Sequence, residues 1–193
     1  MPTFTHLTPR DYRTVPWRNG GGSTREIAIE PGGPGGFLWR LSIAEVAASG
    51  PFSDFAGYER TLLLLDGAGF VLRFAEAPPR RVGRRLEPFT FDGGWHAQCD
   101  LVDGPARDLN LMVARGAVEG RLRVLALARG ERIAAPAGET AVVHLLEGAL
   151  EAGGLGLQAG DTLRADGCRG EPVVLAAAEG SVAIHVALSP APA

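Results

Sequence analysis

The sequence contains no lysine, and this absence excludes several kinds of chemistry and partner. All nineteen basic residues of the 193 are arginines, and twenty-two acidic residues bring the net charge to −3. Without lysine the chain cannot form a Schiff base through a lysine amine. Without a basic excess it offers no field that would recruit nucleic acid or anionic lipid. We therefore expect no nucleic-acid partner and no membrane partner.

Cysteine and long apolar stretches are scarce as well. Cys99 and Cys168 are the only cysteines, no apolar run approaches about 18 residues, and residues 1–10 lack the layout of a signal peptide. A chain of this length can bury about 70% of its unfolded surface, so it needs no disulfide framework. We expect a cytoplasmic protein.

Helical periodicity is also hard to find, whereas short alternating runs separated by glycine and proline recur along the whole chain. Their spacing of about ten residues is typical of a β-sandwich or β-barrel. The predicted strands lie at residues 25–29, 37–43, 60–65, 69–74, 97–103, 108–113, 122–128, 140–146, 149–151, 161–164, 173–177 and 182–188.

A weak internal repeat suggests two units of this kind. Residues 62–72 (LLLLDGAGFVL) resemble residues 143–150 (VHLLEGAL), with an acidic residue and a glycine at matching hairpin positions. Taken by itself, this match between the two segments also has chance as an alternative explanation. The pattern is similar to the double-stranded β-helix of cupins. We predict an all-β bicupin with two jelly-roll barrels: residues 1–117 form an N-terminal barrel with a ligand pocket, and residues 118–193 form a structural or interface barrel.

The segment 16–26 (PWRNGGGSTRE) carries the most specific signal in the chain. Three consecutive glycines are costly to order, and Trp17 would not be placed in a linker. Glycine loops that hold phosphates lead into a helix, but residues 24–30 alternate like a strand, so we set nucleotide binding aside. The segment instead predicts backbone that must approach another group closely, with Arg18 and Asn19 as polar contacts.

Five stretches closely resemble the HutD/Ves family: PWRNGGGSTREI (16–27), WRLSIAEV (39–46), GPFSDFAGYERTLLLLDG (50–67), PFTFDG (88–93) and LVDGPARDLNLM (101–112). The resemblance implies a bicupin fold in the bacterial cytoplasm. For HutD proteins it further implies an association with histidine utilisation and binding of the intermediate N-formylglutamate. The family's usual lysine is replaced here by Arg18, which exchanges a point donor for a planar fork.

Metal-binding cupins carry a first motif with histidine and glutamate ligands. Alignment of Gly50 with the first glycine of that motif puts Ala56, Tyr58 and Leu62 at the ligand positions. His144 and His185 lie on strands without clustered partners at ligand spacing. We therefore expect neither a metal nor another cofactor.

Alternation along the strands indicates which polar side chains share a face. In residues 37–43 Arg40 and Ser42 lie opposite the apolar side chains, and in residues 108–113 Asp108 and Asn110 do the same. The alternative to a ligand site is that Arg40 and Asp108 form a structural ion pair across neighbouring strands, or simply face solvent. The candidate ligand-binding residues are Trp17, Arg18, Asn19, Gly20, Gly21, Thr24, Glu26, Arg40, Ser42, Arg60, Asp108 and Asn110.

The predicted function is a metal-free bicupin that binds a small anionic metabolite of the N-formylglutamate type and regulates or buffers histidine utilisation. One of the three arginines, Arg18, Arg40 or Arg60, would hold a carboxylate. Asn19 and Asn110 would read an amide, and Trp17 would cover the apolar part of the ligand. We expect Glu26 to order an arginine, with a role as general base left open. The alternatives are a metal-independent isomerase or lyase acting on a small carboxylate, and a pure interaction protein; a homodimer is also left open.

Overall fold

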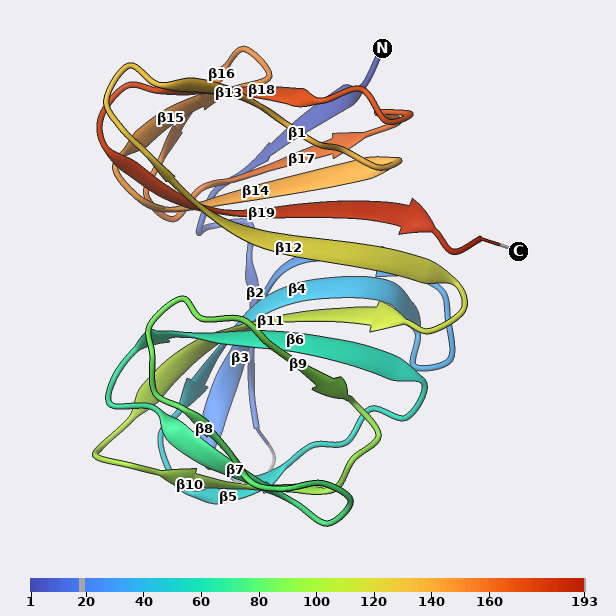
Figure 1. The fold of residues 1–193 in the computed structure, drawn as a ribbon, viewed down its shortest axis with the longest axis vertical. Helices are drawn as coiled ribbons and strands as arrows, with labels where there is room; N and C mark the ends of the chain where they lie inside the picture. Colours follow the sequence, from blue (N-terminus) through green and yellow to red (C-terminus); the bar gives the residue numbers. More distant parts are fainter. Residues whose placement is uncertain (18–19, 193) are drawn as a thin grey trace. The chain divides into compact units, whose positions relative to one another are not determined.

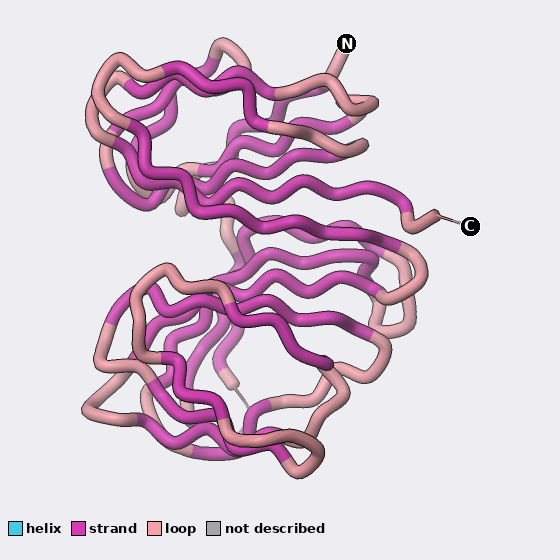
Figure 2. The backbone as a smooth tube through the Cα atoms, viewed as in Figure 1, coloured by secondary structure: helices cyan, strands magenta, loops and turns pink. Residues whose placement is uncertain are grey.

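The computed structural model describes residues 1–17 and 20–192, and within these ranges the chain is built from strands and turns without a helix (Figures 1 and 2). The all-β class is confirmed, and each of the twelve predicted strands overlaps an observed one. In the same ranges the structure contains no helix that could span a membrane.

The chain divides into two compact units. One, here the N-terminal unit, comprises Arg13–Ala117, and the other, the C-terminal unit, comprises Met1–Tyr12 together with Val118–Ala193. Each unit contains one larger and one four-stranded sheet.

In the N-terminal unit the larger sheet has six strands in the order β2 (Arg13–Pro16), β3 (Gly22–Pro31), β4 (Phe37–Val46), β11 (Ala106–Ala114), β6 (Tyr58–Asp66) and β9 (Phe89–Asp92). The smaller sheet has the order β5 (Gly50–Phe52), β10 (Ala97–Leu101), β7 (Phe70–Phe74) and β8 (Arg80–Val82). Alternate residues such as Leu62 and Leu64 on β6 and Phe70 and Leu72 on β7 pack in one apolar cluster that joins the two sheets.

In the C-terminal unit the larger sheet has the order β1 (Thr3–Leu7), β17 (Thr162–Asp166), β14 (Thr140–Glu147), β19 (Ser181–Pro190) and β12 (Val118–Leu127). The smaller sheet has the order β13 (Arg132–Ala135), β18 (Val173–Ala177), β15 (Ala149–Ala152) and β16 (Leu155–Gln158). Its core includes Val143, Leu145, Leu150, Leu163 and Leu175, all nearly inaccessible to solvent.

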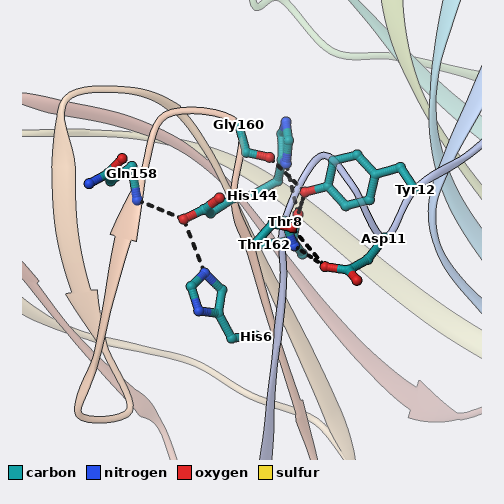
Figure 3. A network of polar contacts seen from close by, with 9 residues as sticks. His6, Thr8, Asp11, Tyr12, His144, Gln158, Gly160 and Thr162 are labelled. Carbon is teal, nitrogen blue, oxygen red and sulfur yellow. Dashed lines mark hydrogen bonds and ion pairs between the residues drawn. The ribbon is translucent and has the colours of Figure 1, made fainter.

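The first twelve residues belong to the C-terminal unit, so the predicted domain of residues 1–117 is wrong at its start. β1 pairs with β17 in antiparallel register. The His6 ring is 3.0 Å from Asp161, and the Tyr12 hydroxyl donates to the Gly160 carbonyl at 2.6 Å and lies 2.7 Å from Thr162 Oγ1 (Figure 3). These polar contacts hold the N-terminal strand on the sheet whose other members lie more than a hundred residues later.

The internal repeat coincides with equivalent strands in the two units. When residues 62–67 are matched with residues 143–148, Asn110 lies opposite Leu62 and His185 lies opposite Val143. Both strand pairs then have a β-bulge at the same place, at residue 65 in one unit and at residue 146 in the other. A shared register and a shared bulge support two barrels built on one plan.

Candidate ligand-binding site

A cavity of about 690 Å³ lies inside the N-terminal unit. Its wall is formed by β2, β3, β4, β11 and β6 of the larger sheet, by β5 and β10 of the smaller sheet, and by residues 53–55. This size is typical of small-molecule sites. Seven of the residues predicted from the sequence line it: Trp17, Thr24, Glu26, Arg40, Ser42, Arg60 and Asn110.

Three of these residues form a polar row across adjacent strands. Glu26 on β3 lies opposite Ser42 on β4, and Ser42 lies opposite Asn110 on β11. Directly opposed side chains on one face of a sheet are neighbours, with Cβ atoms about 5 Å apart. Strand alternation therefore brings an acid, a hydroxyl and an amide from distant parts of the sequence to one wall of the cavity.

Arg40 is a cation without a carboxylate partner among the described residues. Its Nη2 donates to the thioether sulfur of Met112 at 3.4 Å, a weak acceptor, and its buried Nε has no hydrogen-bond partner there. The guanidinium carbon lies 4.8 Å from the centre of the Phe37 ring and 5.2 Å from that of Phe55. Burial lowers the pKa of Arg40, while the charge of Glu26 opposes that change.

Arg60, by contrast, is already committed to protein groups. It is 4% exposed, its Nη1 donates to the Ser53 carbonyl at 2.9 Å, and its Nη2 donates to Asn110 Oδ1 at 2.9 Å. Its guanidinium carbon also lies 4.8 Å from the Phe52 ring centre and 5.2 Å from that of Phe91. Burial lowers the pKa of Arg60 to about 10. Arg60 therefore shapes the wall of the cavity and is not a free fork for a ligand.

Asp108 lies two residues before Asn110 on β11 and does not line the cavity. Its side chain accepts a hydrogen bond from Asn110 Nδ2 through Oδ2, while the buried Oδ1 has no partner among the described residues. Burial raises the pKa of Asp108 to about 7, although Arg60 acts in the opposite direction. The ion pair with Arg40, considered as an alternative above, is wrong, because Arg40 lies opposite Met112 and Asp108 lies opposite Ala44.

The glycine-rich segment brings Trp17 against the cavity. The indole Nε1 donates to Thr24 Oγ1 at 2.8 Å, and the Trp17 backbone N–H donates to the Gly22 carbonyl at 2.9 Å. A Cβ atom at residue 22 would lie 2.1 Å from the Glu45 carbonyl oxygen and 3.1 Å from the indole ring. Glycine is therefore required at residue 22 for the close approach of two strands and an aromatic ring.

Two other glycines of this segment shape the chain without facing the cavity. The Gly21 carbonyl accepts hydrogen bonds from the backbone of residues 47 and 48, and Gly20 has a φ of +70°. Neither residue lines the cavity, nor does Asp108, so the predicted direct contact of these three with a ligand has no support in the geometry. The predicted site residues Arg18 and Asn19 lie outside the described residues.

The HutD family model matches residues 9–184. The chain belongs to the HutD family. It is 36% identical to a conserved protein of unknown function from Pseudomonas aeruginosa PAO1, with a TM-score of 0.86 over 97% of this chain and 99% of that one. It is 33% identical to HutD from Pseudomonas fluorescens SBW25, whose structure comes from a formate condition, with a TM-score of 0.84 over 98% of this chain and 100% of that one.

Curated relatives match this HutD-family chain over a shorter region. An uncharacterized 21.2 kDa protein in the hutC 3′ region of Pseudomonas putida is 42% identical over 64% of this chain and 65% of that protein. The chain thus spans less than two thirds of the length of that relative. Distant solved structures show the cupin fold alone, for example YhhW from Escherichia coli at 10% identity, with a TM-score of 0.71 over 98% of each chain.

Metal ligands are absent from the places where metal-binding cupins carry them. The aligned positions in this HutD-family chain hold Ala56, Tyr58 and Leu62, and the Tyr58 hydroxyl donates to the Phe37 carbonyl at 2.7 Å. Among the described residues no group of three or more histidine, cysteine, aspartate or glutamate side chains is arranged to hold a metal ion. The His144 ring is already hydrogen-bonded to Thr162 Oγ1 at 2.8 Å.

Part of the cavity wall went unrecognised in the sequence. Phe52 and Phe55 line the cavity and pack against the two guanidinium groups. His96 also lines the cavity, and its Nδ1 lies 2.7 Å from Glu76. The available signal was the stretch GPFSDFAGYER, where two phenylalanines flank a turn between motif strands.

Proposed function

We propose that the N-terminal unit binds a small anionic metabolite of the N-formylglutamate type, and that its occupancy regulates or buffers histidine utilisation in the cytoplasm. The names of two relatives support the pathway: HutD of P. fluorescens, and the hutC 3′-region protein of P. putida. The family's shared motifs lie mainly in this unit, and most of the cavity-lining polar residues belong to them.

The observation that carries the proposal is that Arg40 has no carboxylate partner among the described residues. A largely buried cation is costly unless an anion compensates it. The described residues give Arg40 a thioether acceptor, two aromatic rings and the nearby charge of Glu26, which forms no ion pair with it. A ligand carboxylate that accepts from the guanidinium would supply the missing charge through strong, charge-assisted hydrogen bonds. Arg60 differs in that both of its terminal nitrogens already donate to protein oxygens, although its buried Nε, like that of Arg40, has no partner among the described residues.

The rest of the wall fits an acylated amino acid. Asn110 keeps one Nδ2 hydrogen beyond the one given to Asp108, and it can donate that hydrogen to a ligand carbonyl or carboxylate. Trp17 supplies an apolar cover for the methylene chain. A dissociation constant between micromolar and millimolar would correspond to roughly 4 to 8 kcal/mol.

Calorimetric titration of N-formylglutamate tests the proposal. Arg40→Gln is expected to weaken binding about ten- to a hundredfold, the loss of a charge-assisted contact of about 1.5 to 3 kcal/mol. Arg73→Gln is the matched control, because Arg73 is exposed, pairs with Asp100 and lies outside the cavity. If wild-type protein shows no binding, or if folded Arg40→Gln protein binds as tightly as wild type, the proposal is wrong.

A metal-independent enzyme is the second candidate, and one observation favours it. The pKa of Asp108 is raised to about 7 by burial, as for carboxyls that transfer protons near neutral pH. Asp108 nevertheless does not line the cavity, whereas Asn110, which donates a hydrogen bond to it, does. Proton NMR of N-formylglutamate incubated with the protein distinguishes the two functions: an unchanged spectrum supports a binding protein, and new resonances support an enzyme.

A further inference from the structure

The amide donor of Asn110 on the cavity wall is fixed in orientation by neighbouring side chains. A guanidinium can only donate, so an amide group that contacts it must present its oxygen. The contacts of Asn110 with Arg60 and Asp108 therefore settle which way its amide points: Oδ1 toward Arg60 and Nδ2 toward Asp108. Arg40 Nε is likewise a donor without a partner among the described residues. This side of the cavity therefore offers donors to a ligand.

Glu26 gives the same wall an acceptor. It lines the cavity half-buried, and no described residue makes a hydrogen bond or ion pair with its carboxylate. Its strand partners are Ser42 and the exposed Arg13. The other carboxylate that lines the cavity, Asp54, is exposed and lies 3.9 Å from His96 Nε2. Glu26 is thus a charged acceptor that faces the cavity beside the donors.

The spacing of these groups fits one small molecule. Glu26 and Asn110 lie on strands separated by β4 alone, which places their backbones about 10 Å apart. Both side chains line the cavity, so one small molecule can contact both. A dianion without a donor would meet repulsion at Glu26, whereas a compound with an N–H group next to a carboxylate satisfies both sides.

From this arrangement we infer that Glu26 accepts a hydrogen bond from a ligand N–H, so that the site selects α-amino-acid derivatives over carboxylates that lack the nitrogen. This inference rests on the proposed function and narrows it. Glu26 is then a specificity-determining residue, in addition to its favourable charge near Arg40.

The test compares N-formylglutamate with freshly prepared 2-formyloxyglutarate, in which an ester oxygen replaces the N–H. Wild-type protein is expected to bind the amide at least about tenfold more tightly, because the ester has no hydrogen to donate and its oxygen faces a carboxylate. Glu26→Leu is expected to bring this ratio close to one, mainly by weakening the amide. Glu26→Gln is expected to retain part of it, because its Oε1 can still accept.

Glu45→Leu is the matched control, since Glu45 is an exposed residue of β4 outside the cavity, and it is expected to keep the wild-type ratio. Thermal melting confirms that each variant is folded. Equal binding of the two compounds by wild type overturns this inference alone. It is also overturned if Glu26→Leu weakens the binding of both compounds equally, because that is the result expected if Glu26 only balances the charge of Arg40. Failure of wild type to bind either compound overturns the proposed function as well.

Discussion

Replacement of Asp108 by asparagine is expected to stabilise the folded protein progressively as the pH rises. Asp108 is fully buried, and burial raises its pKa from the ordinary 3.8 to about 7. Between these two values the folded protein holds a proton that the unfolded chain has lost. The free energy of unfolding of wild type therefore falls as the pH rises through this interval, and the asparagine variant has no such loss.

The magnitude follows from the interval between the two pKa values. Each pH unit contributes about 1.4 kcal/mol, so the variant gains up to about 4 kcal/mol on wild type between pH 4 and pH 7, and the gain stays constant above pH 7. Asparagine can still accept the hydrogen bond from Asn110 through its own Oδ1. The change with pH, and not the difference at a single pH, is therefore the quantity to measure.

Urea unfolding at pH 4.5, 6 and 8 provides the measurement. Asp103→Asn removes an exposed loop carboxylate and controls for the general effect of a lost surface charge. The reasoning is refuted if the stability difference between Asp108→Asn and wild type does not change with pH. It is also refuted if wild type gains on the variant as the pH rises, since attraction to Arg60 would then outweigh the cost of burial.

Two further predictions concern other parts of the chain. His185 is buried and lies opposite Arg123, and its pKa is lowered from 6.5 to about 4, chiefly by burial. The free energy of unfolding of wild type should therefore fall by about 3 kcal/mol between pH 6.5 and pH 4. Urea unfolding of His185→Leu should show no such fall. If His185→Leu loses as much stability in acid as wild type does, this prediction is wrong. Gly22→Ala should cost about 1 to 3 kcal/mol and lower Tm by several degrees, because the new Cβ would lie 2.1 Å from the Glu45 carbonyl oxygen. Gly50→Ala, with open space at its Cβ, should melt close to wild type, and equal melting of both variants contradicts the reasoning.

The local sequence pattern was sufficient to predict the fold class and to predict which side chains share a face of each long strand. Residues 37–43 and 108–113 alternate because side chains on a strand point to opposite faces in turn, and Arg40, Ser42 and Asn110 do line one cavity. The three-residue strands β5 and β8 escaped prediction because so short a segment cannot show an alternation. Cys99 is buried, and burial raises the pKa of its thiol to about 12.

The sequence by itself determined a β-rich chain, its internal repeat and the set of polar residues from which a site could be built, because these depend on period-two alternation and on turn chemistry. Only the tertiary structure decided which of Arg40 and Arg60 has terminal nitrogens available to a ligand. Arg60 is occupied by Asn110, fifty residues away, and by a loop carbonyl, while Arg40 meets Met112 and two rings. The tertiary structure likewise assigned residues 1–12 to the C-terminal unit, because β1 pairs with β17. Partner choice between distant strands depends on register and packing across the whole unit, which no local pattern contains.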